Sequence, residues 1–282
     1  MIADPVFSAT DERLQSAISV PAVVKAASDK NDSQVFPQTP GILMRDGALV
    51  RLAHASEEAD AISNIAPWGT TLVAKGFDAS RETAMSSDVG QYQIVHFATH
   101  GFLNSEHPEL SGLVFTTTDR NGVKTNGLMP LHDIYSLELS AELTVLSACQ
   151  TALGKEIKGE GLVGLAHAFM AAGSKSVVAS LWKVDDRATA VFMADFYESV
   201  LQKGLPPAAA LRAAKLKMMR DKQWSAPYYW AGFELQGEYA NPIVVTHYTW
   251  IGPRFILLSL LILIVVGLVV FQLTRQRLPG YR

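Results

Sequence analysis

Apolar positions follow two different patterns along this chain. Short runs of aliphatic and aromatic residues predict buried strands, and longer stretches with apolar residues every three or four positions predict amphipathic helices. The predicted strands cover residues 70–74, 91–99, 143–147 and 176–182, and the predicted helices cover residues 55–65, 162–172, 187–202 and 207–220. Residues 119–122, Asp-Arg-Asn-Gly, predict the turn of a small hairpin. Strands that alternate with helices indicate the α/β class, with a parallel sheet and right-handed crossovers.

Two of the predicted strands lead to side chains that can do chemistry. Residues 91–99 lead to His100, and residues 143–147 lead to Cys149, the only cysteine of the chain. Open parallel sheets place reactive groups at the carboxyl ends of their strands, so we expect His100 and Cys149 to share one edge. A cysteine about 50 residues after a histidine is also the spacing of caspase-type thiol proteases. In such a pair the imidazole helps to form the thiolate and serves the leaving group.

The carboxyl-terminal part of the chain predicts a membrane anchor. Residues 255–273 carry no charge and are almost entirely aliphatic or phenylalanine. As a helix they span about 28 Å, close to the ~30 Å hydrocarbon layer of a bilayer. The alternative interpretation is a buried core helix. We expect a single-pass membrane protein in which residues 243–254 form a linker before the span and residues 274–282 a basic tail after it.

The charges around this span and the start of the chain disagree about the membrane side of the large domain. The tail carries Arg275, Arg277 and Arg282 against Arg254 before the span. The positive-inside rule then places the tail in the cytoplasm and the large domain outside. Residues 1–5, however, lack the basic and apolar regions of a signal peptide. The two observations agree if the natural start lies further upstream.

Composition limits the class of partner and the forces that hold the fold. The net charge is −3, and residues 1–250 carry 20 basic against 27 acidic side chains. A globular part this acidic argues against nucleic acid as a partner. A single cysteine forms no internal disulfide, so packing of the 49% hydrophobic residues must hold the fold.

Several motifs in a fixed order resemble the CHAT domain. They are residues 97–101 (FATHG), 146–154 (LSACQTALG), 159–162 (GEGL), 179–186 (ASLWKVDD) and 227–233 (PYYWAGF). CHAT domains are caspase- and separase-like modules, common in bacteria behind tetratricopeptide repeats. The resemblance covers about residues 1–237 and implies a caspase-haemoglobinase-like parallel sheet flanked by helices. Residues 41–242 are then the CHAT domain, and residues 1–40 a remnant of its first strand followed by a polar loop.

The resemblance implies a cysteine endopeptidase whose catalytic dyad is His100 and Cys149. The backbone N–H groups of Gly101 and Cys149 would stabilise the oxyanion of the tetrahedral intermediate. The flanks of Cys149, Ser-Ala before it and Gln-Thr after it, differ from the caspase signature. The caspase preference for aspartate therefore does not transfer.

A stretch similar to residues 181–186 occurs in separases, which prefer arginine before the scissile bond. This similarity makes Asp185 and Asp186 candidates for a substrate-binding pocket. One of them can instead be the N-cap of the helix that begins at Arg187. Both interpretations hold if one carboxylate caps the helix and the other faces the pocket.

The expected partners are a protein or peptide substrate, the lipid bilayer, and a tetratricopeptide-repeat sensor region or partner. No cofactor is expected. Family members usually carry helical repeats and an opening strand before the sequence with which this chain begins. If activity requires those parts, this truncated form is inactive. The main alternative function is therefore a CHAT-fold interaction or signalling module with a silent dyad.

Two further sequence matches point to ligands but lack the required context. His96 and His100 lie four apart like zinc ligands, yet the segment lacks the glutamate of an HExxH site and is predicted as strand. Residues 159–164 match GxGxxG and make a nucleotide-binding switch a second alternative function. That fingerprint follows its strand directly, whereas residues 148–158 intervene here. Because the HExxH glutamate is missing, we also expect no metal site.

Overall fold

The computed structural model describes residues 1–17, 44–45, 48–104, 108–147, 149–153 and 160–245. They belong to the first of two units, Met1–Val245. The second unit, Thr246–Arg282, lies outside the described residues, and so does the predicted membrane helix. Within the described ranges, no helix combines the length and the apolar character needed to cross a bilayer. The membrane anchor stays a prediction.

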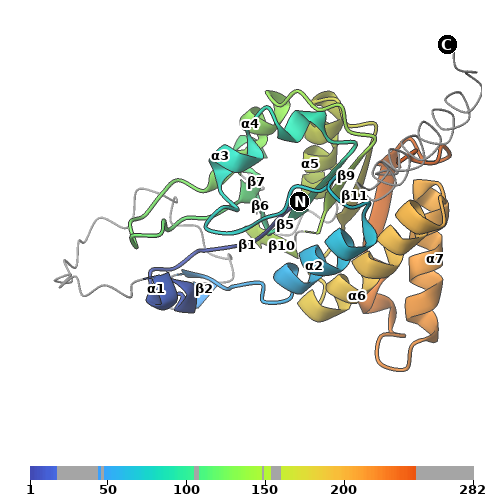
Figure 1. Cartoon of the computed structure of the whole chain (residues 1–282), viewed down its shortest axis with the longest axis horizontal. Coiled ribbons are helices and arrows are strands. Elements are labelled where there is room, and N and C mark those ends of the chain that lie inside the picture. The colour runs from blue at the N-terminus through green and yellow to red at the C-terminus, as the bar shows by residue number, and fades with distance from the viewer. Residues whose placement is uncertain (18–43, 46–47, 105–107, 148, 154–159, 246–282) are drawn as a thin grey trace, which may run out of the picture. The chain divides into compact units, whose positions relative to one another are not determined.

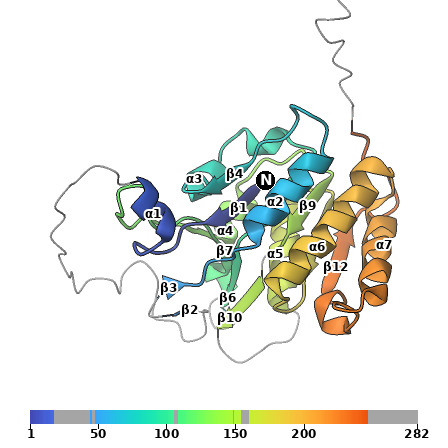
Figure 2. The same ribbon diagram turned by 60° about the horizontal axis from the view of Figure 1, so that its bottom comes forward.

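A mixed, mostly parallel sheet of six strands forms the centre of the first unit, in the order β12-β11-β9-β5-β1-β4. Figure 1 labels β11, β9, β5 and β1 of this sheet, and Figure 2 labels β12 and β4. The parallel strands are β1 (Ile2–Pro5), β4 (Ala74–Gly76), β5 (Ile94–Ala98), β9 (Leu143–Leu146) and β11 (Ser176–Ser180). At one edge, β12 (Phe233–Gly237) pairs antiparallel with β11. The α/β class and the parallel sheet predicted from the sequence are confirmed.

The strand predicted at residues 70–74 is wrong in position, because β4 begins only at Ala74. Its neighbour β1 begins at Ile2, which is the register partner of Ala74. Residues 70–73 therefore have no strand beside them to pair with in the described structure. The position of β1, which is distant in sequence, sets where β4 starts.

Helices cover both faces of the sheet (Figures 1 and 2). On one face lie α2 (Ala55–Ile65), α6 (Asp186–Tyr197), which continues as a π-helix over Glu198–Gln202, and α7 (Pro207–Arg220). On the other face lie α3 (Arg81–Ala84), α4 (Leu131–Tyr135) and α5 (Glu160–Ala171). Successive strand residues point to opposite faces of the sheet. In β11, Val177 and Ala179 pack in the core on the α5 side, and Val178 packs in the core on the α6 side. Burial on both faces explains why these strands are continuously apolar.

A second sheet extends the two central strands. Its order is β10-β6-β7-β8, with β6 (His100–Asn104), β7 (Gly112–Val114), β8 (Leu128–Pro130) and β10 (Cys149–Leu153). β6 follows β5 after one residue, and β10 follows β9 after two. The antiparallel pair β7 and β8 confirms the predicted hairpin, with a turn in which Gly122 N–H donates to the Asp119 carbonyl. The sequence analysis did not predict a second sheet.

The remaining elements are short. They are α1 (Glu12–Ala17), the antiparallel pair β2 (Met44–Arg45) and β3 (Ala48–Leu49), and the 3-10 turns Val89–Gln91, Pro108–Leu110 and Pro227–Tyr229. The segment from Val50 to His54, between β3 and α2, has no regular secondary structure. It nevertheless passes close to His100, through the carbonyl of Val50.

Candidate active site

His100 and Cys149 begin two neighbouring strands of the second sheet. β6 runs parallel to β10, and the Cα atoms of His100 and Cys149 are register partners. Upstream, Phe97 of β5 pairs with Leu146 of β9, so the offset of 49 positions (146 − 97 and 149 − 100) continues from one sheet into the other. Neighbouring strands lie about 4.8 Å apart. The structure thus brings these two positions together, although the side chain of Cys149 lies outside the described part.

The imidazole of His100 is buried and held from two sides. Its side chain is 1% exposed, and the ring of Phe7 packs against it with 5.2 Å between ring centroids. Nε2 lies 2.7 Å from the carbonyl oxygen of Val50. A carbonyl only accepts hydrogen bonds, so Nε2 must carry the hydrogen. This contact selects the tautomer in which Nδ1 of the neutral ring has the lone pair.

The buried Nδ1 of His100 has no hydrogen-bond partner among the described residues. Burial lowers the pKa of His100 below its ordinary value, and the positive charge of Lys183 lowers it further, against the effect of the Val50 carbonyl. The ring is therefore neutral near pH 7. A neutral imidazole with an unpaired Nδ1 is a competent general base.

Gly101 lies beside His100 in the middle of the second sheet. It is buried, and its register partners are Gln150 on β10 and Leu113 on β7. The backbone at Gly101 is thus fixed on both sides by neighbouring strands. Its role as an oxyanion donor, with Cys149, stays a prediction.

Asp185 and Asp186 take different positions at the start of α6. Asp185 is the N-cap, and its carboxylate accepts a hydrogen bond from Ala188 N–H at 2.9 Å. Asp186 accepts from the backbone N–H of His54 at 2.8 Å, which ties the start of α6 to the start of α2. Burial raises the pKa of Asp186 above its ordinary value, against the effect of the His54 contact. The capping interpretation therefore holds for Asp185, and Asp186 is the more desolvated carboxylate.

A buried polar network lies behind the two central strands. The ring of His96 on β5 is fully buried, with Nε2 2.8 Å from a carboxylate oxygen of Glu58 and Nδ1 3.0 Å from the hydroxyl of Tyr197. The Glu58 contact is close but lies outside regular hydrogen-bond geometry. Ser147 donates to the other carboxylate oxygen of Glu58 at 3.0 Å. Both nitrogens of His96 are thus occupied by protein groups, and the described residues contain no group of three potential metal ligands.

The sequence analysis missed Val50, Phe7, Glu58 and Tyr197. Val50 acts through its backbone, which has no residue-type signal, and Phe7 lies in a segment without periodicity. Glu58 is the one with a usable signal, since it lies on the apolar stripe of the helix 55–65 between Ala55 and Ile62. A carboxylate on that face requires a buried partner.

Two of the motifs noted in the sequence, residues 179–186 and 227–233, meet at the carboxyl end of β11. The indole N–H of Trp182 donates to the carbonyl of Tyr228 at 3.0 Å. A Cβ added at Gly232 would lie 2.8 Å from the same indole, so a side chain there would displace Trp182. The need for this close contact explains the glycine in the segment 227–233.

Comparison with known proteins assigns the chain to a family. The mouse (Mus musculus) protein named tetratricopeptide repeat protein 28 is 32% identical over 235 residues, covering 71% of this chain and 9% of that protein. The human (Homo sapiens) protein of the same name is 29% identical over 235 residues, with the same coverage. The chain thus spans about a tenth of the length of these relatives. The family model described as the CHAT domain matches residues 2–238, which is most of the chain. On this match, the chain belongs to the CHAT domain family.

Proposed function

We propose that this chain is a cysteine endopeptidase of the caspase and separase type, with His100 and Cys149 as its dyad. One observation carries the proposal: the two residues are register partners on β6 and β10. The contact of His100 with the Val50 carbonyl, which leaves Nδ1 as the unprotonated nitrogen, supports it. The CHAT domain belongs to a caspase-like peptidase family, which agrees with this chemistry. In this arrangement, the proton of the Cys149 thiol would move to Nδ1 of His100.

The reaction begins with transfer of the Cys149 thiol proton to Nδ1 of His100. The thiolate attacks the carbonyl carbon of the scissile peptide, and the carbonyl electrons move to oxygen. Backbone N–H groups of Gly101 and Cys149 donate to this oxyanion. Collapse breaks the C–N bond as the imidazolium returns its proton to the leaving amine. Water then hydrolyses the thioester and releases the acid product and free thiol.

The electrostatics around His100 suit this cycle. A free thiol with a pKa near 8.5 is only a few per cent ionised at pH 7, so it needs a base beside it. Burial and Lys183 keep His100 neutral before the reaction. The Val50 carbonyl accepts the Nε2 hydrogen and stabilises the imidazolium once it forms. The ring is therefore basic in the resting enzyme and stabilised as an acid afterwards.

Substrate preference is assigned to Asp186. Its carboxylate is half-buried, and no Lys or Arg side chain pairs with it in the described ranges. A substrate arginine would supply two parallel hydrogen bonds and an opposite charge. Asp185 is committed to the helix cap. The proposal is therefore cleavage after a basic residue, with Asp186 as the recognising carboxylate.

Residues 255–273 are proposed to anchor the enzyme in a membrane, on the strength of their length and lack of charge. The relatives bear the name of tetratricopeptide repeat proteins and are much longer than this chain. A region of such repeats is therefore the proposed sensor or partner of the domain. The activating signal would act through that region.

A silent interaction module is the second candidate, and the burial of His100 favours it. At 1% exposure, the imidazole is closed to a substrate in the described conformation. The peptidase therefore requires an opening at the site, whereas an interaction module does not. Labelling with a peptide acyloxymethyl ketone separates the two candidates. Wild type should be labelled, and Cys149→Ala and His100→Ala should not. If wild type is not labelled alone, with added tetratricopeptide-repeat protein or with added membranes, the peptidase is rejected.

A further inference from the structure

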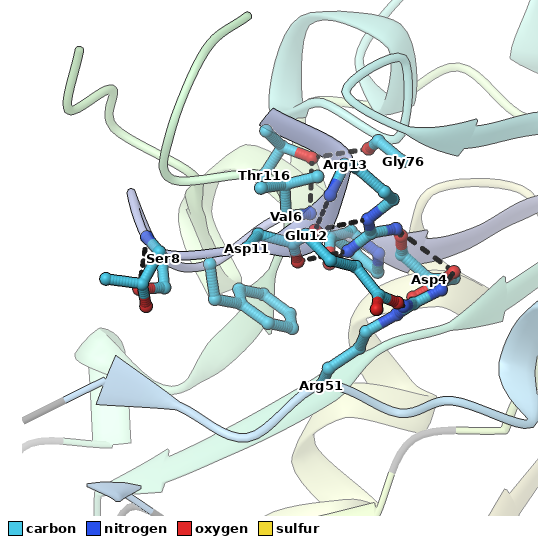
Figure 3. A network of polar contacts seen from close by, with 12 residues as sticks. Asp4, Val6, Ser8, Asp11, Glu12, Arg13, Arg51, Gly76 and Thr116 are labelled. Carbon is cyan, nitrogen blue, oxygen red and sulfur yellow. Dashed lines mark hydrogen bonds and ion pairs between the residues drawn. The ribbon is translucent and has the colours of Figure 1, made fainter. Parts of the chain in front are cut away.

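Arg51, the residue after Val50, forms an ion pair with the buried carboxylate of Asp4. Its Nε lies 2.9 Å from Asp4 Oδ1 and its Nη2 lies 2.8 Å from Asp4 Oδ2, so the guanidinium binds both oxygens in parallel (Figure 3). Its Nη1 also contacts the carboxylate of Glu12. These bonds raise the pKa of Arg51 above its ordinary value, against the effect of partial burial. The cation is therefore present at every pH at which the protein works.

Asp4 is itself held in an unusual backbone position. Its φ is +50°, the left-handed region that non-glycine residues rarely adopt, and the β1–β4 register shifts between Ala3 and Pro5. Such a bulge re-aims a side chain out of the regular alternation of a strand. Arg13 braces it, with Nη1 2.8 Å from the Asp4 carbonyl oxygen and 3.0 Å from Oδ2. The side chain of Asp4 is 3% exposed.

The ion pair of Arg51 with Asp4, called the clamp below, lies one residue after Val50, whose carbonyl orients His100. Val50 and Arg51 lie between β3 and α2, outside any strand or helix, so within the described part of the chain no strand ladder fixes the Val50 carbonyl. The two-pronged bond of Arg51 to Asp4 fixes the adjoining backbone instead. Asp4 lies on β1, and β1 pairs directly with β5, the strand that leads to His100. The ion pair therefore ties Val50 to the six-stranded sheet, whose strand β5 leads into β6 and His100.

We propose that Asp4 and Arg51 are positioning residues: their ion pair holds the Val50 carbonyl against Nε2 of His100, and so keeps Nδ1 as the basic nitrogen. The inference rests on the proposed peptidase function for its catalytic meaning. Neither side chain contacts the reacting atoms. Their effect passes through one backbone carbonyl and appears in the tautomer of His100.

A merely structural ion pair would act differently, and the chain offers a matched control. Arg81 binds Asp133 through Nε at 3.0 Å and Nη2 at 2.7 Å, with side chains 28% and 9% exposed against 33% and 3% for Arg51 and Asp4. It joins α3 to α4 and has no described contact with Val50 or His100. Arg81→Gln therefore removes an ion pair of similar burial without touching the site.

The test uses the full chain in detergent, labelled with 15N-histidine. The two ring nitrogens of His100 are assigned by comparison with His100→Gln, and their shifts report the tautomer. The measurement is made in the Cys149→Ala background, so that it does not depend on an active thiol. Wild type and Arg81→Gln should show the hydrogen on Nε2. Asp4→Asn and Arg51→Gln should show a mixture of tautomers, and the double variant should be no worse than either single variant, because the pair acts as a unit.

Arg51→Lys keeps the positive charge but loses the guanidinium, which binds both oxygens of Asp4. A lysine opposite Asp4 preserves the ion pair and the fold, yet cannot bind both oxygens in parallel. It should shift the His100 tautomer in the same direction as Arg51→Gln, to a smaller extent. A folded Arg51→Lys or Arg51→Gln protein in which His100 keeps the wild-type nitrogen shifts overturns the positioning role.

The second readout links the clamp to catalysis and separates the two proposals. Because Cys149 is the only cysteine, its alkylation by iodoacetamide can be followed against pH in the otherwise native chain. Arg51→Gln should lower the alkylation rate near pH 7 about 10-fold, with Arg81→Gln unchanged. If His100→Ala leaves the wild-type alkylation profile unchanged, the dyad is wrong. An altered profile in His100→Ala with an unaltered one in folded Arg51→Gln leaves the dyad standing and overturns the clamp.

Discussion

Ser147, two residues before Cys149, donates a hydrogen bond of 3.0 Å to the buried carboxylate of Glu58. Glu58 also contacts His96, four residues before His100. Helix α2 is thus joined to both central strands just before each strand reaches the site. The network supports the two backbones that bring His100 and Cys149 into register.

Glu58→Ala should be strongly destabilising. It leaves the buried His96 and Ser147 without their partner, and breaking a buried pair in this way costs about 3–5 kcal/mol. The free energy of unfolding from denaturant titration measures it. Glu57→Ala, on the exposed side of the same helix, is the control and should change stability by less than about 0.5 kcal/mol. Equal effects of the two substitutions would contradict the network.

The dyad variants should be non-additive. Cys149→Ala and His100→Ala each remove the nucleophile or its base, so each should abolish nearly all peptidase activity. The double variant should be little worse than either, because the two groups act as one unit. Peptide cleavage rates measure this, with circular dichroism to show that each variant is folded. Wild-type cleavage by folded Cys149→Ala would refute the protease.

The pKa of His100 predicts how stability depends on pH. Burial lowers it in the folded protein, so between the folded value and the ordinary value of about 6.5 the unfolded chain binds more protons. The His100 contribution is therefore complete above about pH 6.5 and is lost as the pH falls through that value towards the folded pKa. Unfolding of Cys149→Ala at a series of pH values, with and without His100→Gln, isolates it. An unchanged pH slope after His100→Gln would contradict the lowered pKa.

Asp185 and Asp186 should separate into a cap and a recognition residue. Asp185→Ala removes the bond to Ala188 N–H and should cost about 0.5–2 kcal/mol of stability without altering the substrate profile. Asp186→Asn should remove a preference for arginine of about 10-fold in kcat/KM, the effect of one charge-assisted hydrogen bond. A peptide library profiled on both variants measures this. A wild-type preference for an acidic or apolar residue would discard the arginine pocket.

The anchor is tested by fractionation. The full chain should sediment with membranes and resist carbonate extraction, because the proposed helix of residues 255–273 would bury its apolar side chains in the bilayer. A chain that ends at Pro242 should be released into the supernatant. Its folding is checked by circular dichroism, so that aggregation is not mistaken for membrane binding. Full-length protein in the detergent-free soluble fraction would show that there is no anchor.

Local pattern in the sequence was sufficient for most of the fold. The periods of residues 55–65, 143–147 and 207–220 correspond to α2, β9 and α7, because burial of one helix face or of a whole strand leaves a mark in every few residues. The 49-residue separation of His100 and Cys149 also proved to be the register offset of their strands. Because β5 and β9 are neighbours in the sheet, the residues that follow their carboxyl ends lie side by side.

Tertiary structure alone decided how His100 is held. The Val50 carbonyl is 50 positions from His100, Asp4 is 47 positions from Arg51, and Tyr197 is 101 positions from His96. The sequence already contained the candidate base, the candidate nucleophile and the two aspartates, since residue type and local order define these. It contained no sign of which tautomer the base adopts or which aspartate caps the helix. Those outcomes depend on single polar contacts between distant segments, and such contacts leave no period in the chain.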